Sequence, residues 1–415
     1  MRNQEAVNSK IVQRINRSRV LGEIRSAPET ARTALSGRTG LSAASVSNIA
    51  GYLLQTGLIM ETGRENVDRT GRKGILLRFD GSRYRIVTAS LADGVLHLFL
   101  TDLQGAVYAH LEHRLLGADA EATARLLCGG VAQMLASPQA ENVLAVGVSV
   151  SALVLQDGRR VTSARLGWNR MDLRARLETP GDLPVYVTNS SFAKAGWLCR
   201  LHSEWSRGLT LFVDMTHGIG SALLRNGERM DACVGEIGHS VVAPDGEVCS
   251  CGRRGCLEAM CSPARLLRLY AQSGGSAETL SDFSRRLDAG DGGAWRALDD
   301  CAGYLGVALG NLINLFNPER IVLNAEDYAD CPALPERALE AMKAHVVDGL
   351  NRDAPAFVTR FDPADLARSM AGELCDALFS PRFETDVFER IDGMDPDCAD
   401  LLSLRRLRQR LPDRA

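Results

Sequence analysis

The chain has no long uncharged apolar stretch. Nowhere in its 415 residues does the sequence approach the roughly 18–20 apolar residues that a membrane helix needs. A secretion signal is also missing, because charges interrupt the first thirty residues at Arg2, Glu5, Lys10, Arg14, Arg17 and Arg19. We therefore expect a cytoplasmic protein that makes no contact with a membrane.

Disorder and a fibrous architecture are equally excluded, because 45% apolar and 24% charged residues is an ordinary globular composition. The length predicts about two to four domains, at roughly 100–200 residues each. The 11 cysteines lie at irregular spacing. Without a secretion signal, such spacing favours reduced thiols over a disulfide framework.

Charge divides the chain into two parts. Residues 1–80, which we call the head, hold 13 Lys and Arg against 7 Asp and Glu. Residues 81–415, the body, hold the other 35 basic and 44 acidic residues. Basic surfaces attract the phosphates of nucleic acid, so the head is a candidate DNA-binding module. An ordinary solvated surface is the alternative on charge alone.

The head has the pattern of a winged helix-turn-helix. Apolar spacing predicts a helix over residues 9–24, Pro28 is placed to open a second over 29–38, and Thr39-Gly40 ends it. Ser42 is a good N-cap for a third helix, and Gly57-Leu58-Ile59 begins the expected wing. A helical hairpin that binds nothing is the alternative. The residues predicted to contact a major groove are small: Ser42, Ala43, Ala44, Ser45, Ser47 and Asn48.

Residues 62–74 have the glycine-rich, basic composition of a linker. Arginine beside glycine can enter a narrow minor groove, so Arg72 and Lys73 form a second candidate DNA contact. A solvated hinge is the alternative for this segment.

The body alternates strand and helix patterns, which indicates an α/β fold. Helical patterns cover residues 121–135 and 305–316. Strand patterns cover residues 85–91, 95–102, 144–150, 185–188, 209–214 and 320–323. The sequence does not show whether these strands form one sheet or two.

A cysteine cluster is the strongest local signal. Cys249, Cys251 and Cys256 lie within eight residues, and His239 lies ten positions before the first of them. Thiolates and an imidazole suit tetrahedral Zn²⁺, and four protein ligands make a closed, structural site. Gly252 and Gly255 allow the tight loop that this site needs. Unliganded buried cysteines are the alternative.

These residues carry a family resemblance. Gly235-Glu236-Ile237-Gly238-His239, followed by Cys-x-Cys-Gly-x-x-Gly-Cys-Leu-Glu from Cys249 to Glu258, resembles the signature of the ROK family of repressors, open reading frames and kinases. Gly218-Ile219-Gly220 resembles its second phosphate loop, and residues 311–323 its approach to the adenosine site. The head resembles the winged helix-turn-helix of the repressor branch, of the xylose and N-acetylglucosamine repressor type, which kinase members generally lack.

The resemblance implies an actin-like (ribonuclease H-like) body of two lobes with a sugar cleft between them. We expect the head and linker over residues 1–80 and a small lobe over 81–188, completed by 375–415. A large lobe with the zinc site is expected over 189–374. The resemblance also implies that the sugar-binding positions are Asn189, Glu236, His239 and Glu258. His239 would then bind zinc through one ring nitrogen and a sugar hydroxyl through the other.

The sequence departs from the kinase pattern where phosphoryl transfer needs specific groups. Ser190 stands where the family has its catalytic Asp, and serine is too weakly basic to replace it. Further departures are Ser90-Leu91-Ala92-Asp93-Gly94 in the first phosphate loop, Asn324-Ala325-Glu326 in the adenosine loop, and Ser151-Ala152 in place of a Pro-Gly turn. We therefore predict a regulator, most simply a repressor of carbohydrate metabolism genes, and not an enzyme.

Two alternatives stay open: an active ATP-dependent sugar kinase with a DNA-binding head, and a DNA-binding regulator that needs no ligand. The predicted partners are double-stranded operator DNA and a sugar or sugar derivative. A homodimer or homotetramer is expected, because two heads are needed to reach two half-sites. Residues 400–415 have the pattern of an amphipathic basic helix, which favours core or dimer packing over a membrane anchor.

Overall fold

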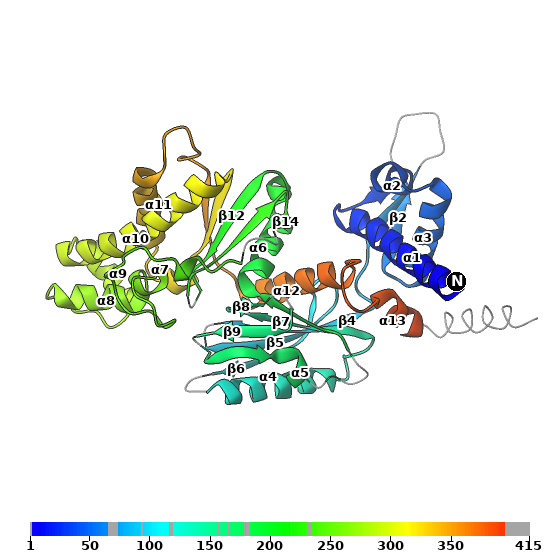
Figure 1. The fold of residues 1–415 in the computed structure, drawn as a ribbon, viewed down its shortest axis with the longest axis horizontal. Helices are drawn as coiled ribbons and strands as arrows, with labels where there is room; N and C mark the ends of the chain where they lie inside the picture. Colours follow the sequence, from blue (N-terminus) through cyan, green and yellow to red (C-terminus); the bar gives the residue numbers. More distant parts are fainter. Residues whose placement is uncertain are drawn as a thin grey trace, which may run out of the picture.

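The structure of the protein is a computed structural model. It describes residues 2–64, 74–92, 94–115, 119–155, 158–164, 166–177, 179, 183–216, 218–230 and 234–394. Figure 1 shows three bodies: the head, a sheet that carries β4 to β7, and a second sheet that carries β12 and β14. Helices α6 and α12 lie between the two sheets.

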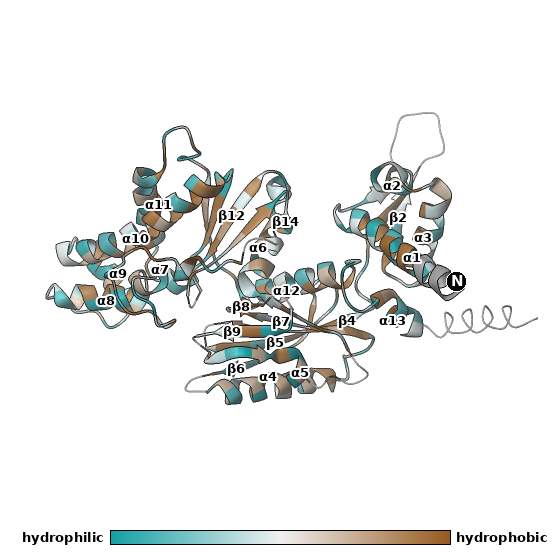
Figure 2. Ribbon diagram, in the orientation of Figure 1, coloured by the Kyte–Doolittle hydropathy of each residue, from teal (hydrophilic) through white to brown (hydrophobic). Residues whose placement is uncertain are grey.

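The head follows the order of a winged helix-turn-helix. Its elements are α1 (Arg2–Arg25), β1 (Thr30–Ala31), α2 (Arg32–Thr39), α3 (Ala43–Gln55), β2 (Ile59–Arg64) and β3 (Ile75–Phe79). Gly40 ends α2 with φ 68°, and the Ser42 hydroxyl caps α3 by accepting the Ser45 amide at 3.1 Å. Strands β2 and β3 form the predicted wing. Figure 2 shows both hydrophobic and hydrophilic residues on α1, and Val20, Leu21 and Ile24 of this helix are buried in the core of the head.

Two predicted boundaries in the head are wrong. The first helix begins at Arg2, not at Ser9. The second helix begins at Arg32, not at Glu29, because Thr30 and Ala31 pair as a short strand with Leu77 and Leu76 of β3. Both residues are buried. Sheet pairing therefore overrides the local helix-starting signal of Pro28.

The first sheet of the body, the small-lobe sheet, has the order β11-β7-β4-β5-β6. Strands β4 and β6 are antiparallel to β5, whereas β7 and β11 run parallel to β4. Its elements are β4 (Arg85–Ala92), β5 (Val95–Thr101), β6 (Val107–Arg114), α4 (Ala120–Leu135), β7 (Val143–Val150) and β11 (Val185–Asn189). Between β7 and β11 in the sequence, a small sheet is formed by β8 (Leu153–Val154), β9 (Arg160–Ser163) and β10 (Trp168–Asp172). The short helix α5 (Leu173–Arg176) follows β10.

The second sheet, the large-lobe sheet, has the order β14-β13-β12-β15-β16. Its strands are β12 (Leu209–Asp214), β13 (Gly220–Arg225), β14 (Glu228–Arg229), β15 (Arg320–Asn324) and β16 (Ala356–Thr359). Each sheet is thus an antiparallel meander of three strands followed by two parallel strands on its first edge. The repeated order is the two-lobed, actin-like architecture that the resemblance implied.

Helices cover these sheets. The large-lobe core joins strand residues such as Leu211 and Leu323 to the long helix α10, for example at Leu305. Short helices η2 (Ser203–Ser206), η3 (Ile237–His239), η4 (Glu326–Tyr328) and η5 (Lys343–His345) complete the connections. The large-lobe helices are α7 (Leu257–Met260), α8 (Pro263–Gln272), α9 (Leu280–Asp288), α10 (Gly292–Phe316) and α11 (Ala333–Met342).

Two helices at the junction link the lobes. Helix α6 (Ser190–Leu201) follows β11 directly and contacts β13 of the large-lobe sheet, and it packs along α12 (Pro363–Leu378), which contacts β4, β5 and β7. The chain therefore returns to the small-lobe sheet at Pro363, before the predicted boundary at residue 375. The reason is that α12 supplies the apolar cover for that sheet through Met370 and Leu374. The boundaries at residues 80 and 188 stay predictions.

The head packs on the body through α13 (Val387–Met394), which lies beside α1 in Figure 1. Phe388 is buried against the Tyr52 ring, with centroids 6.1 Å apart, and the Tyr52 hydroxyl donates to Asp392 at 2.8 Å. The guanidinium of Arg17 stacks 3.4 Å from the Tyr52 ring centroid. Head and C-terminal helices thus share one core.

Among the residues that the structure describes, we find no helix that combines the length and the apolar character required to cross a bilayer. The predicted amphipathic helix at 400–415 lies outside the described residues.

Candidate functional site

A cavity of about 560 Å³ lies between the two sheets. The small-lobe side contributes Ser151, Ala152, Thr162 and Ser163, and the large-lobe side Asp214, Gly218 and Gly220. All four predicted sugar-binding residues line it as well: Asn189, Glu236, His239 and Glu258. The four predicted residues, which span 69 positions of the sequence, therefore line one cavity, and its volume is that of a small-molecule site.

Asn189 stands at the end of β11 and caps α6. Its side-chain oxygen accepts the Ser191 amide at 2.8 Å, and its side-chain nitrogen donates to the carbonyl of Ala152 at 2.9 Å. Two contacts fix the amide, while one further lone pair and one further N–H stay available to a ligand. Asn189 is thus held rigidly at the wall of the cavity.

Glu236 and His239 lie on one short turn around η3. The Nε2 atom of His239 is 3.8 Å from a Glu236 carboxylate oxygen, while its Nδ1 is 3.6 Å from the sulfur of Cys249. Burial raises the pKa of Glu236; the nearby His239 opposes this rise and Glu258 adds to it. The imidazole therefore faces the cysteine cluster with one nitrogen and the cavity carboxylate with the other.

Glu258 lies in the first turn of α7, two residues after Cys256. It accepts the hydroxyl of Ser250 at 3.3 Å. A Cβ at Gly218, where φ is 126°, would approach the Glu258 carboxylate to 2.6 Å. The backbone conformation at residue 218 therefore favours glycine, and a side chain there would displace the Glu258 carboxylate.

The predicted metal ligands come together. The ligand atoms of His239, Cys249, Cys251 and Cys256 all lie within 4.8 Å of one another. The sulfurs of Cys251 and Cys256 are 3.7 Å apart, and Cys249 is 3.6 Å from His239 Nδ1. With the usual Zn–S and Zn–N bond lengths, a tetrahedral ion needs edges of about 3.8 and 3.6 Å. The cluster thus has the dimensions of a four-ligand zinc site.

The loop that carries these ligands is shaped by backbone contacts and glycine. Cys249 donates its amide to the carbonyl of Arg253 at 2.7 Å, and Gly255 has φ 69°. A Cβ at Gly255 would overlap the carbonyl of Ala243 at 1.5 Å, so a side chain there is excluded. Cys261, outside the four, is buried in the large-lobe core.

The thiols differ in acidity. The pKa of Cys251 is lowered to about 6, first by the backbone N–H of Arg253 and then by its side chain and the neighbouring thiols. Burial raises the pKa of Cys256 to about 12, and hydrogen bonding to Cys251 adds to this. Cys251 is thus the first thiolate available to a cation, and a bound ion would favour ionisation of the others.

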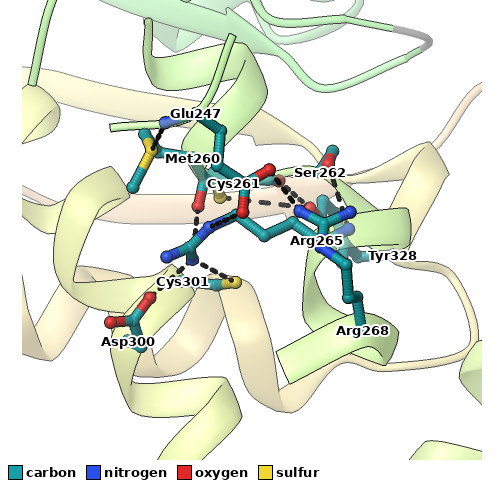
Figure 3. A network of polar contacts seen from close by, with 9 residues as sticks. All are labelled: Glu247, Met260, Cys261, Ser262, Arg265, Arg268, Asp300, Cys301 and Tyr328. Carbon is teal, nitrogen blue, oxygen red and sulfur yellow. Dashed lines mark hydrogen bonds and ion pairs between the residues drawn. The ribbon is translucent and has the colours of Figure 1, made fainter. Parts of the chain in front are cut away.

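Arg265, on α8, ties the two ends of the cysteine loop together (Figure 3). Its guanidinium donates to Glu247 at 3.1 Å, just before Cys249, and to the carbonyl of Met260 at 3.1 Å, just after the motif. It also pairs with Asp300 on α10. The Arg265 side chain is 7% exposed. This buried cation, which sequence reasoning missed, fixes the loop to the helices beneath it.

A second buried cluster, of which Asp214 and Thr216 line the cavity, was also missed. Lys194 of α6, 2% exposed, binds the Asp214 carboxylate at 3.1 Å, and both Thr216 and Asn324 donate to Asp214 at 2.7 Å. Asp214 ends strand β12, four residues before Gly218-Ile219-Gly220. This glycine turn was the sequence signal that could have pointed to Asp214. The ammonium is neutralised by its partner, so it offers no open charge to a phosphate.

Ser190, which the resemblance predicted to stand in place of a catalytic Asp, is buried at the start of α6. Its hydroxyl lies 2.9 Å from that of Ser151. The two hydroxyls satisfy each other across the cavity wall. Neither is a carboxylate that can take up a proton at neutral pH.

The predicted DNA-contacting residues lie on α3 and its cap. Ser42, Ala43, Ala44, Ser47 and Asn48 are exposed, whereas Val46 and Leu53 are buried. Ser45 is half-buried, and its hydroxyl is 2.9 Å from that of Ser42. The face therefore presents small side chains to solvent. Arg72 and Lys73 lie outside the described residues.

Comparison with known proteins identifies the family. The sequence profile described as "ROK family" matches residues 96–371, more than half of the chain. The chain therefore belongs to the ROK family. It is 26% identical to the xylose repressor of Bacillus subtilis strain 168 over 77% of this chain and 84% of that protein. It is also 26% identical to the DNA-binding transcriptional dual regulator NagC of Escherichia coli K12, over 77% and 82%.

Solved structures share the fold. A ROK family transcriptional regulator, described as a homolog of the Escherichia coli MLC protein, superposes with a TM-score of 0.74 at 22% identity, covering 92% of this chain and 99% of that one. A ROK family glucokinase from Streptomyces griseus has a TM-score of 0.57 at 20% identity, covering 69% and 98%. The regulator structure covers 92% of this chain, and the uncovered remainder is smaller than the 80-residue head. The match therefore includes part of the head.

We predict that Arg265→Met lowers the free energy of unfolding by on the order of 2 kcal/mol, because Asp300 and the carbonyl of Met260 lose a charged donor. Arg268→Met is the matched control: Arg268 also contacts Glu247, but its side chain is 46% exposed, so its loss costs less than about 1 kcal/mol. Urea unfolding followed by circular dichroism measures both. Equal losses in the two variants would contradict a special role for Arg265.

Proposed function

We propose that this protein is a DNA-binding transcriptional repressor of carbohydrate metabolism genes, and that a sugar or sugar derivative bound in the inter-lobe cavity controls it. One observation carries the proposal. The core of the winged helix-turn-helix head continues into α6 and α12, and α6 begins directly after Asn189 on the wall of the inter-lobe cavity. The names of the repressor relatives and the match of the regulator structure support the same function.

The chemistry of the cavity suits a sugar. Carboxylates at Glu236 and Glu258 accept hydrogen bonds, the Asn189 amide both accepts and donates, and a sugar hydroxyl can do either. The exposed face of α3 suits a major groove, where small side chains permit close approach and Asn48 can read an adenine edge. The basic charge of the head adds attraction to the phosphates. A DNA-binding role agrees with the predicted cytoplasmic location.

Catalysis is not part of the proposal, although the family includes kinases. Ser190 supplies no general base, and Asp214 is already engaged by Lys194, Thr216 and Asn324. A cavity that has lost these functions can still bind a sugar, because recognition needs only a shaped set of donors and acceptors. Sensing is therefore favoured over phosphoryl transfer.

Zinc is the proposed ion at the cysteine cluster, held by His239, Cys249, Cys251 and Cys256. The ion would close the loop and hold the His239 ring, whose other nitrogen faces Glu236 and the cavity. Four protein ligands leave no open position, so the role is structural.

The signal from cavity to head has a direct route through α12. One carboxylate oxygen of Asp376 forms an ion pair with the guanidinium of Arg25 in the head, at 2.8 Å. The other oxygen forms an ion pair with the guanidinium of Arg200 on α6, also at 2.8 Å. Helix α6 begins immediately after Asn189 at the cavity wall. A shift of α6 on sugar binding therefore changes a contact that also holds α1. A dimer or tetramer would convert this movement into a changed spacing of two heads on the operator.

We predict that the protein selects specific duplexes from a random pool, and that xylose, N-acetylglucosamine or glucose changes its affinity for them in fluorescence anisotropy. Asn48→Ala should weaken binding about tenfold, since one base contact is worth roughly 1–3 kcal/mol. Asn169→Ala, an exposed asparagine on the small lobe, is the matched control. Equal effects of the two changes would contradict the assigned α3 face.

A sugar panel that leaves the DNA affinity of the unaltered protein unchanged would remove sensing but leave DNA binding. Where a sugar does act, Glu258→Ala should abolish its effect without changing affinity in its absence. Loss of DNA binding in this variant without sugar would contradict the separation of the two sites.

Purified protein should contain about one equivalent of zinc, as measured by total metal analysis. Cys256→Ser should lose it, because three remaining ligands no longer close the site. Cys128→Ser changes a cysteine on α4, far from the cluster in sequence, and should retain the metal. Less than about half an equivalent in the unaltered protein would count against zinc.

Asp376→Asn should reduce the ratio of DNA affinities measured with and without an active sugar towards one. Coupling of this kind is typically worth about 1–3 kcal/mol. Asp365→Asn is the control, since Asp365 lies on the same helix but pairs with Arg368 and not with the head. An unchanged ratio in the Asp376 variant would exclude the route through α12.

A further inference from the structure

Outside the cysteine cluster, one more group of side chains in the described residues combines imidazoles with a carboxylate: His97, His110 and Glu112. The three ligand atoms lie within 4.8 Å of one another. They lie on β5 and β6 of the small-lobe sheet, whereas the cysteine motif belongs to the large lobe. Neither the proposed repressor function nor the sugar cavity uses them.

The sheet fixes these residues in position. His97 and Glu112 are direct cross-strand partners, and His110 is the partner of Phe99, two residues along β5. The Phe99 ring, itself buried, stacks on His110 with centroids 4.5 Å apart and on His97 at 6.1 Å. The two imidazoles are therefore supported by regular strands and one aromatic ring. Sites built on such elements are held more precisely than sites on loops.

The distances suit a shared ion. His97 Nδ1 and His110 Nε2 are 3.2 Å apart, close to the edge of about 3.3 Å that two imidazoles span on a tetrahedral ion. The Glu112 carboxylate is 4.0 Å from His97 Nδ1, and its side chain is 46% exposed, so a rotation can bring it closer. Without an ion the two rings share an N–H···N hydrogen bond. The tautomers that carry their protons on the other nitrogens present both lone pairs to a cation.

We propose that His97, His110 and Glu112 form a second metal site, which binds a divalent first-row transition metal ion such as Zn²⁺. Two imidazoles and one carboxylate select this class over Mg²⁺ and Ca²⁺, which prefer oxygen ligands. Three protein ligands leave one coordination position open to water or to a further ligand. The site lies next to a second cavity of about 100 Å³, which His97 lines together with Asn324 and Phe361.

Calorimetric titration of untagged protein, with zinc already bound at the cysteine cluster, tests the proposal. Added Zn²⁺ should bind as one further equivalent, and His97→Ala and His110→Ala should each weaken this binding at least tenfold. Glu112→Gln, a conservative change on the exposed side, should weaken it less. His113→Ala is the matched control, because strand alternation places His113 on the opposite face of β6, on the side of Leu111. This variant should bind Zn²⁺ as tightly as the unaltered protein does.

Absorption after addition of Co²⁺ to the same zinc-loaded protein separates the two sites. Visible d–d bands without a thiolate charge-transfer band are expected, because Co²⁺ binds less tightly than zinc and should not displace it from the cysteines. A thiolate band, no further equivalent of Zn²⁺, or equal binding by the His97, His110 and His113 variants would overturn the proposal.

Discussion

The packing of α6 against α12 is the constraint on which the rest of the structure depends. Helix α6 begins at the cavity wall directly after Asn189, and α12 covers the small-lobe sheet and carries Asp376 towards the head. Because the two helices pack along each other and contact both sheets, we expect a displacement of one to be transmitted to the other. The two lobes, the cavity between them and the head therefore form one mechanical unit, which is what a ligand-controlled DNA-binding protein requires.

The cysteine loop supplies the other fixed point. The three cysteines and His239 place four ligand atoms at distances that suit a tetrahedral ion, and Arg265 ties the loop to α8 and α10 beneath it. The same loop presents Glu258 and the free face of His239 to the cavity. The zinc ion that we propose at this position would order this wall of the cavity without taking part in chemistry.

Local patterns were readable in the sequence and long-range pairings were not. The cap at Ser42, the stop at Gly40 and the cysteine spacing depend on neighbouring residues, so the sequence predicts them correctly. The strand at Thr30–Ala31 and the return of the chain at Pro363 depend on partners far along the chain, and both were missed or misplaced. The Arg265 and Lys194 clusters were invisible for the same reason: each joins residues from separate helices and strands, and no periodicity marks a buried ion pair.

The central claim is that a phosphotransferase fold here binds a sugar without transforming it. Ser190 pairs with Ser151 where a general base is needed, and Lys194 and Asp214 neutralise each other beside the glycine turn. The most direct test is sugar-dependent release of ADP from Mg-ATP by the purified, zinc-containing protein, across a panel of aldoses and N-acetylated sugars. The account predicts no release above the sugar-free background for any of them. Stoichiometric conversion of one sugar to its phosphate, with repeated turnover, would contradict it.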